Sequence, residues 1–417
     1  MNPPVTRDVP QAPLALMMLH ASVDGHHDVM TLDLNFITDQ RKLSSFQPDI
    51  VGISCMSFQR DTVFQISRKL KENDLAIVVG GSHPTIAPKQ VLKRSTIDYV
   101  IMGEGEVAFS KLLDALERGS PLNEVPNLGY KKNGKIRLNP VEQIEDLGSL
   151  PFPAYASIDM HRYKTRDHQY TLEVPYETSR GCPFKCIFCC VNRLKGSYRV
   201  MSLDRVFQDI EKIAELYPRD SVLLNLFDNN FSFSRKRTLE FCRRLEERPW
   251  HSRVNWMCAA RADQIDEALA KEMSKTGLVK VFIGGEVGYD SGLRSLQKGI
   301  STGDIYNAVE ACLPYGIRVE VGFIVGFPWE KKDDIRKTLS FAVQLEEMGA
   351  STGLYKCVPY PNTPLWKYLE ARKIRIDTSN SSSFDFFSES LIFEHPYLED
   401  NDLSSIVCKH LDHKNPS

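Results

Sequence analysis

Residues 179–190 read SRGCPFKCIFCC, and this stretch decides the fold. It places Cys182, Cys186 and Cys189 in the spacing Cys-x3-Cys-x2-Cys, directly after a predicted strand at 174–178. Three thiolates on one short loop can converge on a single soft metal centre. Iron–sulfur clusters are held by cysteine thiolates, usually four, so three would leave one iron open for a ligand that is also the reactant.

The cysteine cluster could also be a zinc site or arise by chance. A zinc site favours two Cys-x2-Cys pairs or suitably spaced histidines, and beyond Cys190 the remaining cysteines of the ten are scattered singly. A non-catalytic zinc- or thiol-binding module is therefore an alternative hypothesis. We expect Cys190 to pack away from the metal rather than to serve as a fourth ligand.

Length and charge exclude several classes of protein. The chain has 417 residues and a net charge of −2, from 52 Lys plus Arg against 54 Asp plus Glu. This balance argues against a large basic surface for nucleic acid, and the length fits two or three domains. The apolar runs at 14–19 and 321–329 are too short for a secretory signal or a membrane helix. We expect a cytoplasmic protein in a reducing compartment, with no membrane span and no nucleic-acid partner.

Strand and helix signals alternate over residues 1–120, which predicts a doubly wound α/β domain. The predicted strands are Val29–Leu34, Ile50–Cys55, Ala76–Val79 and Tyr99–Met102, and the predicted helices are Ala12–Ser22, Asp61–Glu72 and Glu106–Glu117. Residues 121–170 break the rhythm with a hairpin around Asn133-Gly134 and a stiff linker at 150–153.

The alternation resumes over residues 171–365 and predicts a partial (β/α)6 barrel, whose site would lie at the carboxyl ends of the strands. The six predicted strands are Val174–Thr178, Val222–Phe227, Val254–Ala260, Leu278–Ile283, Arg318–Val325 and Gly353–Val358. Residues 366–417 are irregular and predict a C-terminal cap. Its aromatic residues, expected to cover core, are Phe384, Phe386, Phe387, Phe393 and Tyr397.

The cysteine segment resembles the motif of the radical S-adenosylmethionine (SAM) superfamily, Cys-x3-Cys-x-aromatic-Cys, with Phe188 as the aromatic residue. The resemblance implies that Cys182, Cys186 and Cys189 bind a [4Fe–4S] cluster whose open iron chelates SAM. One electron then cleaves SAM to a 5′-deoxyadenosyl radical, which abstracts hydrogen from the substrate. Phe188 would lie near the adenine. A one-electron reductant of the flavodoxin or ferredoxin type is implied, and no general acid or base can be named.

Later strand ends match the same superfamily in order. The matching segments are Phe227–Phe231, Ile283–Gly288 and Gly322–Pro328. By resemblance, Asp228 belongs to an acidic loop facing SAM, and Glu286 approaches its ribose or amino acid part. Arg261, a planar donor, would pair with the SAM carboxylate. Gly322, Ile324 and Gly326 match the fifth-strand pattern Gly-x-Ile-x-Gly. By resemblance, its glycines would let backbone lie against adenosine.

The first domain resembles the cobalamin-binding domain that precedes many radical SAM domains. The matching segments are Pro48–Ser54, Gly80–Thr85 and Gly103–Glu106. The expected cobalamin contacts are Ser54, Gly80, Gly81 and His83.

Two features depart from that pattern. Asn2-Pro3-Pro4 opens the chain, so the strand that usually precedes this motif is expected to be missing. Asp24–Val29 has valine where the histidine-ligated proteins need glycine. We therefore predict that His26 and His27 form a polar turn rather than a cobalt ligand.

The resemblance implies a radical SAM enzyme. In the leading hypothesis it carries out cobalamin-dependent methyl transfer to an unactivated carbon or phosphorus of a small molecule. An alternative is a cobalamin-free radical SAM enzyme for cyclisation or rearrangement, whose degenerate first domain serves as a lid or dimer surface.

Overall fold

The computed structural model describes residues 1–5, 10–36, 41–163, 169–385, 390–399, 402–403 and 405–406. The chain divides into two compact units. The first comprises Met1–Pro175 and Val191–Asp209, and the second comprises Tyr176–Cys190 and Ile210–Ser417. The segment that directly follows the cysteine loop, 191–209, thus belongs to the first unit.

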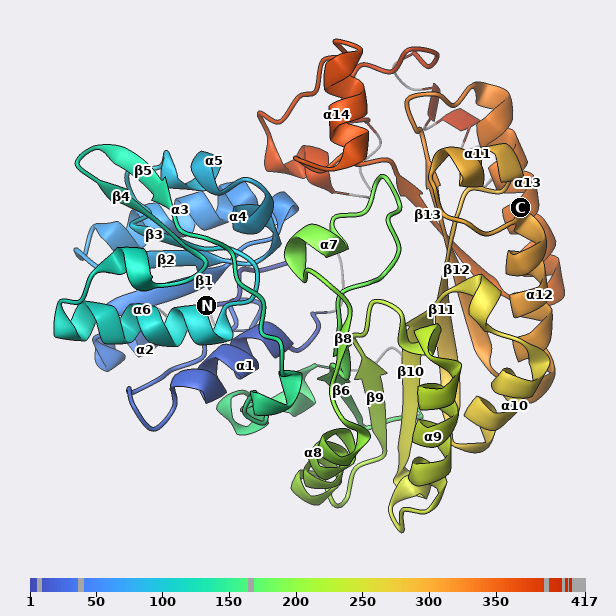
Figure 1. Cartoon of the computed structure of the whole chain (residues 1–417), viewed down its shortest axis with the longest axis horizontal. Helices are drawn as coiled ribbons and strands as arrows, with labels where there is room; N and C mark the ends of the chain where they lie inside the picture. Colours follow the sequence, from blue (N-terminus) through green and yellow to red (C-terminus); the bar gives the residue numbers. More distant parts are fainter. Residues whose placement is uncertain are drawn as a thin grey trace. The chain divides into compact units, whose positions relative to one another are not determined.

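The first unit contains a five-stranded sheet in the order β1-β2-β3-β4-β5 (Figure 1). Its strands are β1 (Ile50–Ser54), β2 (Ala76–Gly80), β3 (Tyr99–Ile101), β4 (Leu128–Lys132) and β5 (Lys135–Leu138). The first three are parallel, and β4 and β5 form the predicted antiparallel hairpin. Asn133 and Gly134 have φ of 52° and 71°, the left-handed backbone that a two-residue hairpin turn requires.

Helices cover both faces of this sheet. The helices of this unit are α1 (Leu14–Val23), α2 (Arg41–Phe46), α3 (Arg60–Lys71), α4 (Ser82–Ile86), α5 (Pro88–Leu92), α6 (Glu106–Arg118) and α7 (Val191–Leu194). Ile77 and Val79 belong to one core with Val63 of α3, whereas Val78 belongs to another with Leu112 of α6. This alternation places a core on each face, so the doubly wound architecture is confirmed.

The predicted strand at 29–34 is wrong. Its only described pairing is a bridge between Asp33 and Asn2, whose N–H donates to the Leu32 carbonyl at 2.9 Å. Asp33 is buried, and its carboxylate accepts the Asn35 N–H at 2.9 Å, which turns the chain. On its other side the N-terminal segment pairs with β1, since the Met1 carbonyl accepts the Ser54 N–H at 3.0 Å.

The second sheet has six strands in the order β13-β12-β11-β10-β9-β6. They are β6 (Leu172–Tyr176), β9 (Val222–Leu226), β10 (Val254–Ala260), β11 (Leu278–Glu286), β12 (Arg318–Val325) and β13 (Ser351–Lys356), with the short strands β7 (Ser179–Arg180) and β8 (Arg199–Val200) elsewhere. Pairing from β9 to β13 is parallel throughout. Sequential parallel strands with crossover helices confirm the predicted partial barrel.

The crossover helices α9, α10, α12 and α13 cover one face of this sheet (Figure 1). The helices of this half are α8 (Leu203–Leu216), α9 (Arg235–Glu246), α10 (Glu267–Lys275), α11 (Asp290–Ser295), α12 (Thr302–Cys312), α13 (Lys332–Met348) and α14 (Pro364–Ala371). All carboxyl ends of the parallel strands therefore meet at one edge, where the loops with the motif residues follow.

The C-terminal segment packs on the second unit. Leu398 and Leu403 join a core with Val325 of β12. Phe384 and Phe393 are buried, as expected for core-covering aromatics, but Tyr397 is 54% exposed. Phe386 and Phe387 lie outside the described residues.

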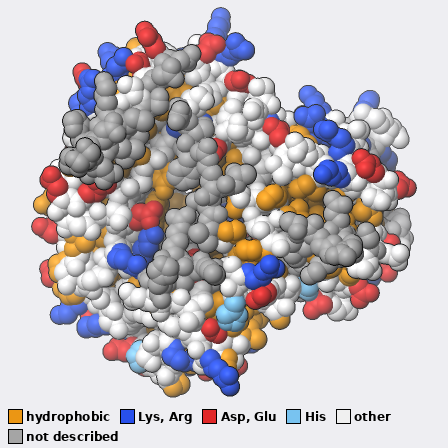
Figure 2. Space-filling view, turned by 180° about the vertical axis from the view of Figure 1, so that it is seen from behind, with side chains coloured by type: hydrophobic (Ala, Val, Ile, Leu, Met, Phe, Trp, Pro, Cys, Tyr) orange, Lys and Arg blue, Asp and Glu red, His pale blue; other side chains and the backbone are white. Residues whose placement is uncertain are grey.

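The surface carries charges of both signs. On the face shown in Figure 2, Lys and Arg side chains lie interspersed with Asp and Glu, and hydrophobic side chains are exposed among them. Among the described helices, none has both the length and the apolar character needed to cross a membrane.

Candidate metal centre and cofactor-binding loops

The cysteine loop presents its thiols to the surface. Cys182, Cys186 and Cys189 are partly exposed and in no disulfide, whereas every other described cysteine outside this loop is buried. Gly181, with φ of 81°, turns the chain into the loop, and the Cys189 N–H donates to the Cys186 carbonyl at 3.1 Å. Burial raises the pKa of the neighbouring Cys190 thiol to about 11, and burial also raises the pKa of the Cys186 thiol.

The chemistry of the donor set fits an iron–sulfur cluster. Cysteine thiolates are the usual ligands of such clusters, and three of them would leave one iron open. One short loop supplies these three cysteines.

Asp228 anchors the strand end that leads into the cysteine loop. Its carboxylate is buried and accepts the Thr178 N–H at 2.7 Å, the Thr178 hydroxyl at 2.6 Å and the Ser179 hydroxyl at 2.5 Å. Burial raises the pKa of Asp228, although these hydrogen bonds and Arg237 act against that rise. The side chain expected to face SAM is thus directed at the backbone before the cysteines.

The turn 296–299, which sequence reasoning missed, joins three predicted site elements. The Leu296 carbonyl accepts the Ile187 N–H of the cysteine loop at 3.1 Å. The carbonyls of Lys298 and Gly299 accept hydrogen bonds from Arg261. The Lys298 ammonium lies 2.8 Å from a carboxylate oxygen of Glu286.

Arg261 is committed to protein partners. Besides the two carbonyls of the turn, it donates to the Asp263 carboxylate at 2.8 Å and 3.2 Å. Its guanidinium lies 3.8 Å from the ring centroid of Phe184 in the cysteine loop. Arg261 therefore holds the cysteine loop against the end of β10.

Glu286 sits at an irregular point in the sheet. Its φ is 62°, and the register of β11 with β12 shifts between Gly284 and Glu286. Left-handed backbone at a non-glycine residue is strained and is typical of functional sites. Burial lowers the pKa of Lys298, but the Glu286 carboxylate outweighs this effect, so the pKa of the ammonium is raised.

Gly322 in β12 and Gly326 just after it are required by protein packing. A Cβ on Gly322 would lie 2.7 Å from the Phe282 ring. Gly326 has φ of 85°, and a Cβ there would lie 3.0 Å from Leu391. Ile324 is half-buried between them. In the cysteine loop, Phe188 lies edge-on to Phe327, with 6.1 Å between the ring centroids.

In the first unit, the predicted cobalamin residues divide into two groups. Ser54 and Gly80 pair at the carboxyl ends of β1 and β2, the edge where such sheets bind ligands. Gly81, with φ of 108°, lets the chain pass Cys55, because a Cβ would lie 3.0 Å from the Cys55 carbonyl oxygen. His83 is fully buried, with Nδ1 3.1 Å from the Ser57 hydroxyl, and burial lowers its pKa to about 4. Its ring lies in the interior of the domain.

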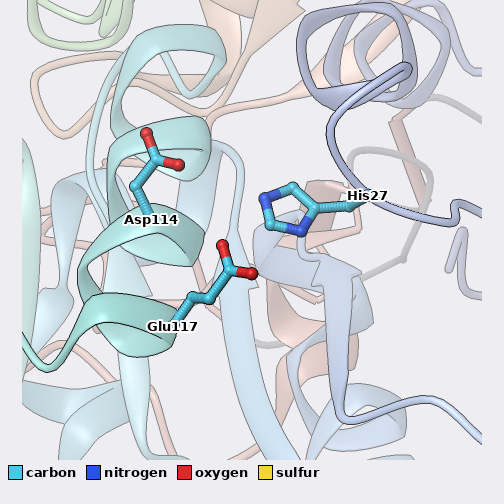
Figure 3. A group of neighbouring side chains, drawn as sticks. All are labelled: His27, Asp114 and Glu117. Carbon is cyan, nitrogen blue, oxygen red and sulfur yellow. The ribbon is translucent and has the colours of Figure 1, made fainter.

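His27 lies beside the last turns of α6 (Figure 3). It faces Asp114 and Glu117, and one ligand atom from each of the three lies within 4.8 Å of the others. Because α6 starts after the carboxyl end of β3 and runs back along the sheet, these turns lie toward the opposite edge. His27 as a polar turn residue rather than a cobalt ligand stays a prediction.

Comparison with known proteins identifies both units. The model of the B12 binding domain matches residues 5–113, and that of the Radical SAM superfamily matches residues 176–342. An uncharacterized methyltransferase of Pyrococcus horikoshii is 31% identical over 373 residues, covering 87% of this chain and 79% of that protein.

A second relative is an anaerobic magnesium-protoporphyrin IX monomethyl ester cyclase of Rubrivivax gelatinosus. It is 28% identical over 376 residues, covering 86% of this chain and 66% of that protein. The solved methyltransferase TsrM of Kitasatospora setae, with cobalamin and a [4Fe–4S] cluster bound, superimposes with a TM-score of 0.77. At 18% identity, covering 99% of this chain and 91% of that one, it shares the fold.

Proposed function

The chain belongs to the radical SAM enzymes with a B12-binding domain, and from this premise we propose that it methylates an unactivated carbon or phosphorus centre of a small molecule. The observation that carries the proposal is the presence, in one chain, of a three-cysteine loop at a barrel strand end and a cobalamin-type sheet. The relative from Pyrococcus horikoshii, itself named a methyltransferase, supports it.

The cofactors would be held by the loops at the carboxyl ends of the strands. Cys182, Cys186 and Cys189 would bind the [4Fe–4S] cluster and leave one iron for SAM. When bound, the cluster supplies the electron that cleaves SAM, and cobalamin carries the methyl group. In the first unit, the backbone of Ser54 and Gly80 would approach cobalamin, while Gly81 and His83 shape that edge from within.

The remaining predicted SAM residues would take two kinds of role. Glu286, oriented by Lys298, would contact the SAM amino acid part or ribose, with Phe188 and Ile324 toward the adenosine. Asp228 and Arg261 would act as positioning residues for the cysteine loop, because their polar atoms are already engaged by protein groups. Gly322 and Gly326 would support this surface through the packing that they permit.

The partners follow from the same chemistry. The substrate would be a small molecule and the reductant a flavodoxin- or ferredoxin-type protein. Balanced charge supports the expectation of no nucleic-acid partner. The free cysteines of the described chain suit a reducing, cytoplasmic location.

The proposal is tested by anaerobic reconstitution with iron, sulfide and hydroxocobalamin, followed by incubation with SAM and a reductant. We expect S-adenosylhomocysteine to form only when cobalamin is present, because this product reports methyl transfer from SAM. If cobalt does not bind and 5′-deoxyadenosine still forms, the cobalamin-free alternative is correct instead. The relative named a cyclase supports keeping ring formation as an alternative reaction in the assay.

A further inference from the structure

The backbone of Phe327, just beyond the carboxyl end of β12, is held from two directions. Glu330 is fully buried, and its Oε2 accepts the N–H groups of Gly326 at 2.7 Å and Phe327 at 2.8 Å. On the carbonyl side, Nε2 of His395 lies 2.8 Å from the Phe327 oxygen. Side chains from two separate segments therefore fix both polar groups of this residue.

The histidine has a defined hydrogen-bonding state. Its Nδ1 accepts the backbone N–H groups of Tyr397 and Leu398, each at 3.1 Å. Because Nδ1 is an acceptor, the proton of the neutral ring is on Nε2, which donates to Phe327. Burial lowers the pKa of His395, which favours this neutral form. Leu398 packs with Val325, so the tail is also anchored by apolar contact.

The clamped residue touches the cysteine loop. The Phe327 ring stacks on Trp329 with centroids 5.3 Å apart, and Phe188 approaches it edge-on at 6.1 Å. The other oxygen of Glu330 accepts the Tyr289 hydroxyl at 3.0 Å. Tyr289 follows Glu286 at the end of β11, so one buried carboxylate links the loops after β11 and β12.

We propose that Glu330 and His395 are positioning residues for SAM. By fixing Phe327 they hold Phe188 against the adenosyl part of the cofactor, so the C-terminal segment takes part in SAM binding. The inference rests on the proposed function, because it takes Phe188 to face the adenine.

The test compares two probes that bind the open iron. SAM carries the adenosyl group, whereas methionine carries only the amino and carboxylate groups. Their dissociation constants are measured from the change each causes in the electron paramagnetic resonance spectrum of the reduced cluster. The variants are His395→Ala, Glu330→Leu and the conservative His395→Gln. The control in the same segment is Glu394→Gln, because Glu394 is exposed and its carboxylate lies 3.6 Å from Arg375.

We expect His395→Ala and Glu330→Leu, which removes the acceptor oxygens, to weaken SAM binding about three- to tenfold, the range that one lost hydrogen bond gives. Methionine affinity and iron content should stay at the wild-type level. His395→Gln should restore part of the SAM affinity, since its amide can donate to the Phe327 carbonyl, and Glu394→Gln should match the wild type.

The inference is overturned if SAM binding and methionine binding weaken equally. It is also overturned if both variants that break the contacts to Phe327 bind SAM with wild-type affinity. If His395→Ala fails to retain its cluster, the comparison of His395→Gln with Glu394→Gln decides the matter by the same criteria. If SAM does not change the electron paramagnetic resonance spectrum of the reduced wild-type enzyme, the proposed function is refuted instead.

Discussion

Replacing Asp228 with asparagine tests whether this carboxylate supports the cysteine loop or contacts SAM directly. Asp228 accepts three hydrogen bonds from Thr178 and Ser179, immediately before the loop. Asparagine has one acceptor oxygen, and its amide nitrogen would face donors. Hydrogen bonds to a buried charged group contribute about 1.5–3 kcal/mol each, so losing two of them should lower the free energy of unfolding by about 3–6 kcal/mol.

The cost should appear as a fall in Tm of roughly 10 °C for a unit of this size. Loosening of the strand end should also lower the iron bound per protein after reconstitution. Thermal unfolding followed by circular dichroism, together with iron analysis, measures both effects. The matched control is Asp266→Asn: Asp266 is an exposed helix cap paired with Arg235, and asparagine caps equally well, so the cost should be about 1 kcal/mol or less.

Asp228→Asn with wild-type Tm and iron content, but weakened SAM binding, would refute the reasoning. That result would assign the carboxylate to the cofactor, as the family pattern alone implies.

Three further predictions concern Glu104, Gly81 and Glu330. Glu104 and Arg199 form a buried, bidentate ion pair at 2.9 Å and 3.0 Å. Glu104→Gln should therefore destabilise the first unit by about 3–5 kcal/mol in urea unfolding. An unchanged urea midpoint would contradict this prediction. Gly81→Ala should lower the free energy of unfolding by about 2–4 kcal/mol, because Gly81 has left-handed backbone and Cys55 lies close to it. In Gly80→Ala the added carbon has no atom closer than 3.9 Å. That variant should fold normally and weaken only cobalamin binding. Burial raises the pKa of Glu330 from 4.5 to about 7, so its contribution to stability is full below pH 4.5 and is lost as pH rises through 7. Glu330→Gln should remove this pH dependence of the free energy of unfolding, which is of order 3 kcal/mol. A variant with the same pH–stability curve as the wild type would contradict the prediction.

Elements that carry their own local signal were predictable from sequence. Asn133-Gly134 specifies a hairpin turn through two left-handed residues, and the Val- and Ile-rich strands of the barrel alternate regularly with amphipathic helices. The segment 29–34 has similar composition but forms no strand. The difference is the pairing partner, which for this segment is the single residue Asn2. The local sequence does not specify which segment a strand pairs with.

The motif residues were found from sequence, but the contacts that position them were not. Lys298 reaches Glu286, 12 residues away, and Tyr289 reaches Glu330, 41 residues away. Neither pairing has a local pattern that could predict it. The role of Gly322 was also hidden, because the ring of Phe282 that fills the space beside it comes from another strand.

Cys182, Cys186 and Cys189 are central to the proposed chemistry, because they would hold the cluster that cleaves SAM. The most direct measurement is the 5′-deoxyadenosine formed by reduced, reconstituted enzyme. We predict that the wild type and Cys190→Ala form this product, and that Cys186→Ala, which lacks one thiolate ligand, forms none. The assignment would be contradicted if wild-type enzyme with its full iron content formed none, or if Cys186→Ala formed as much as the wild type.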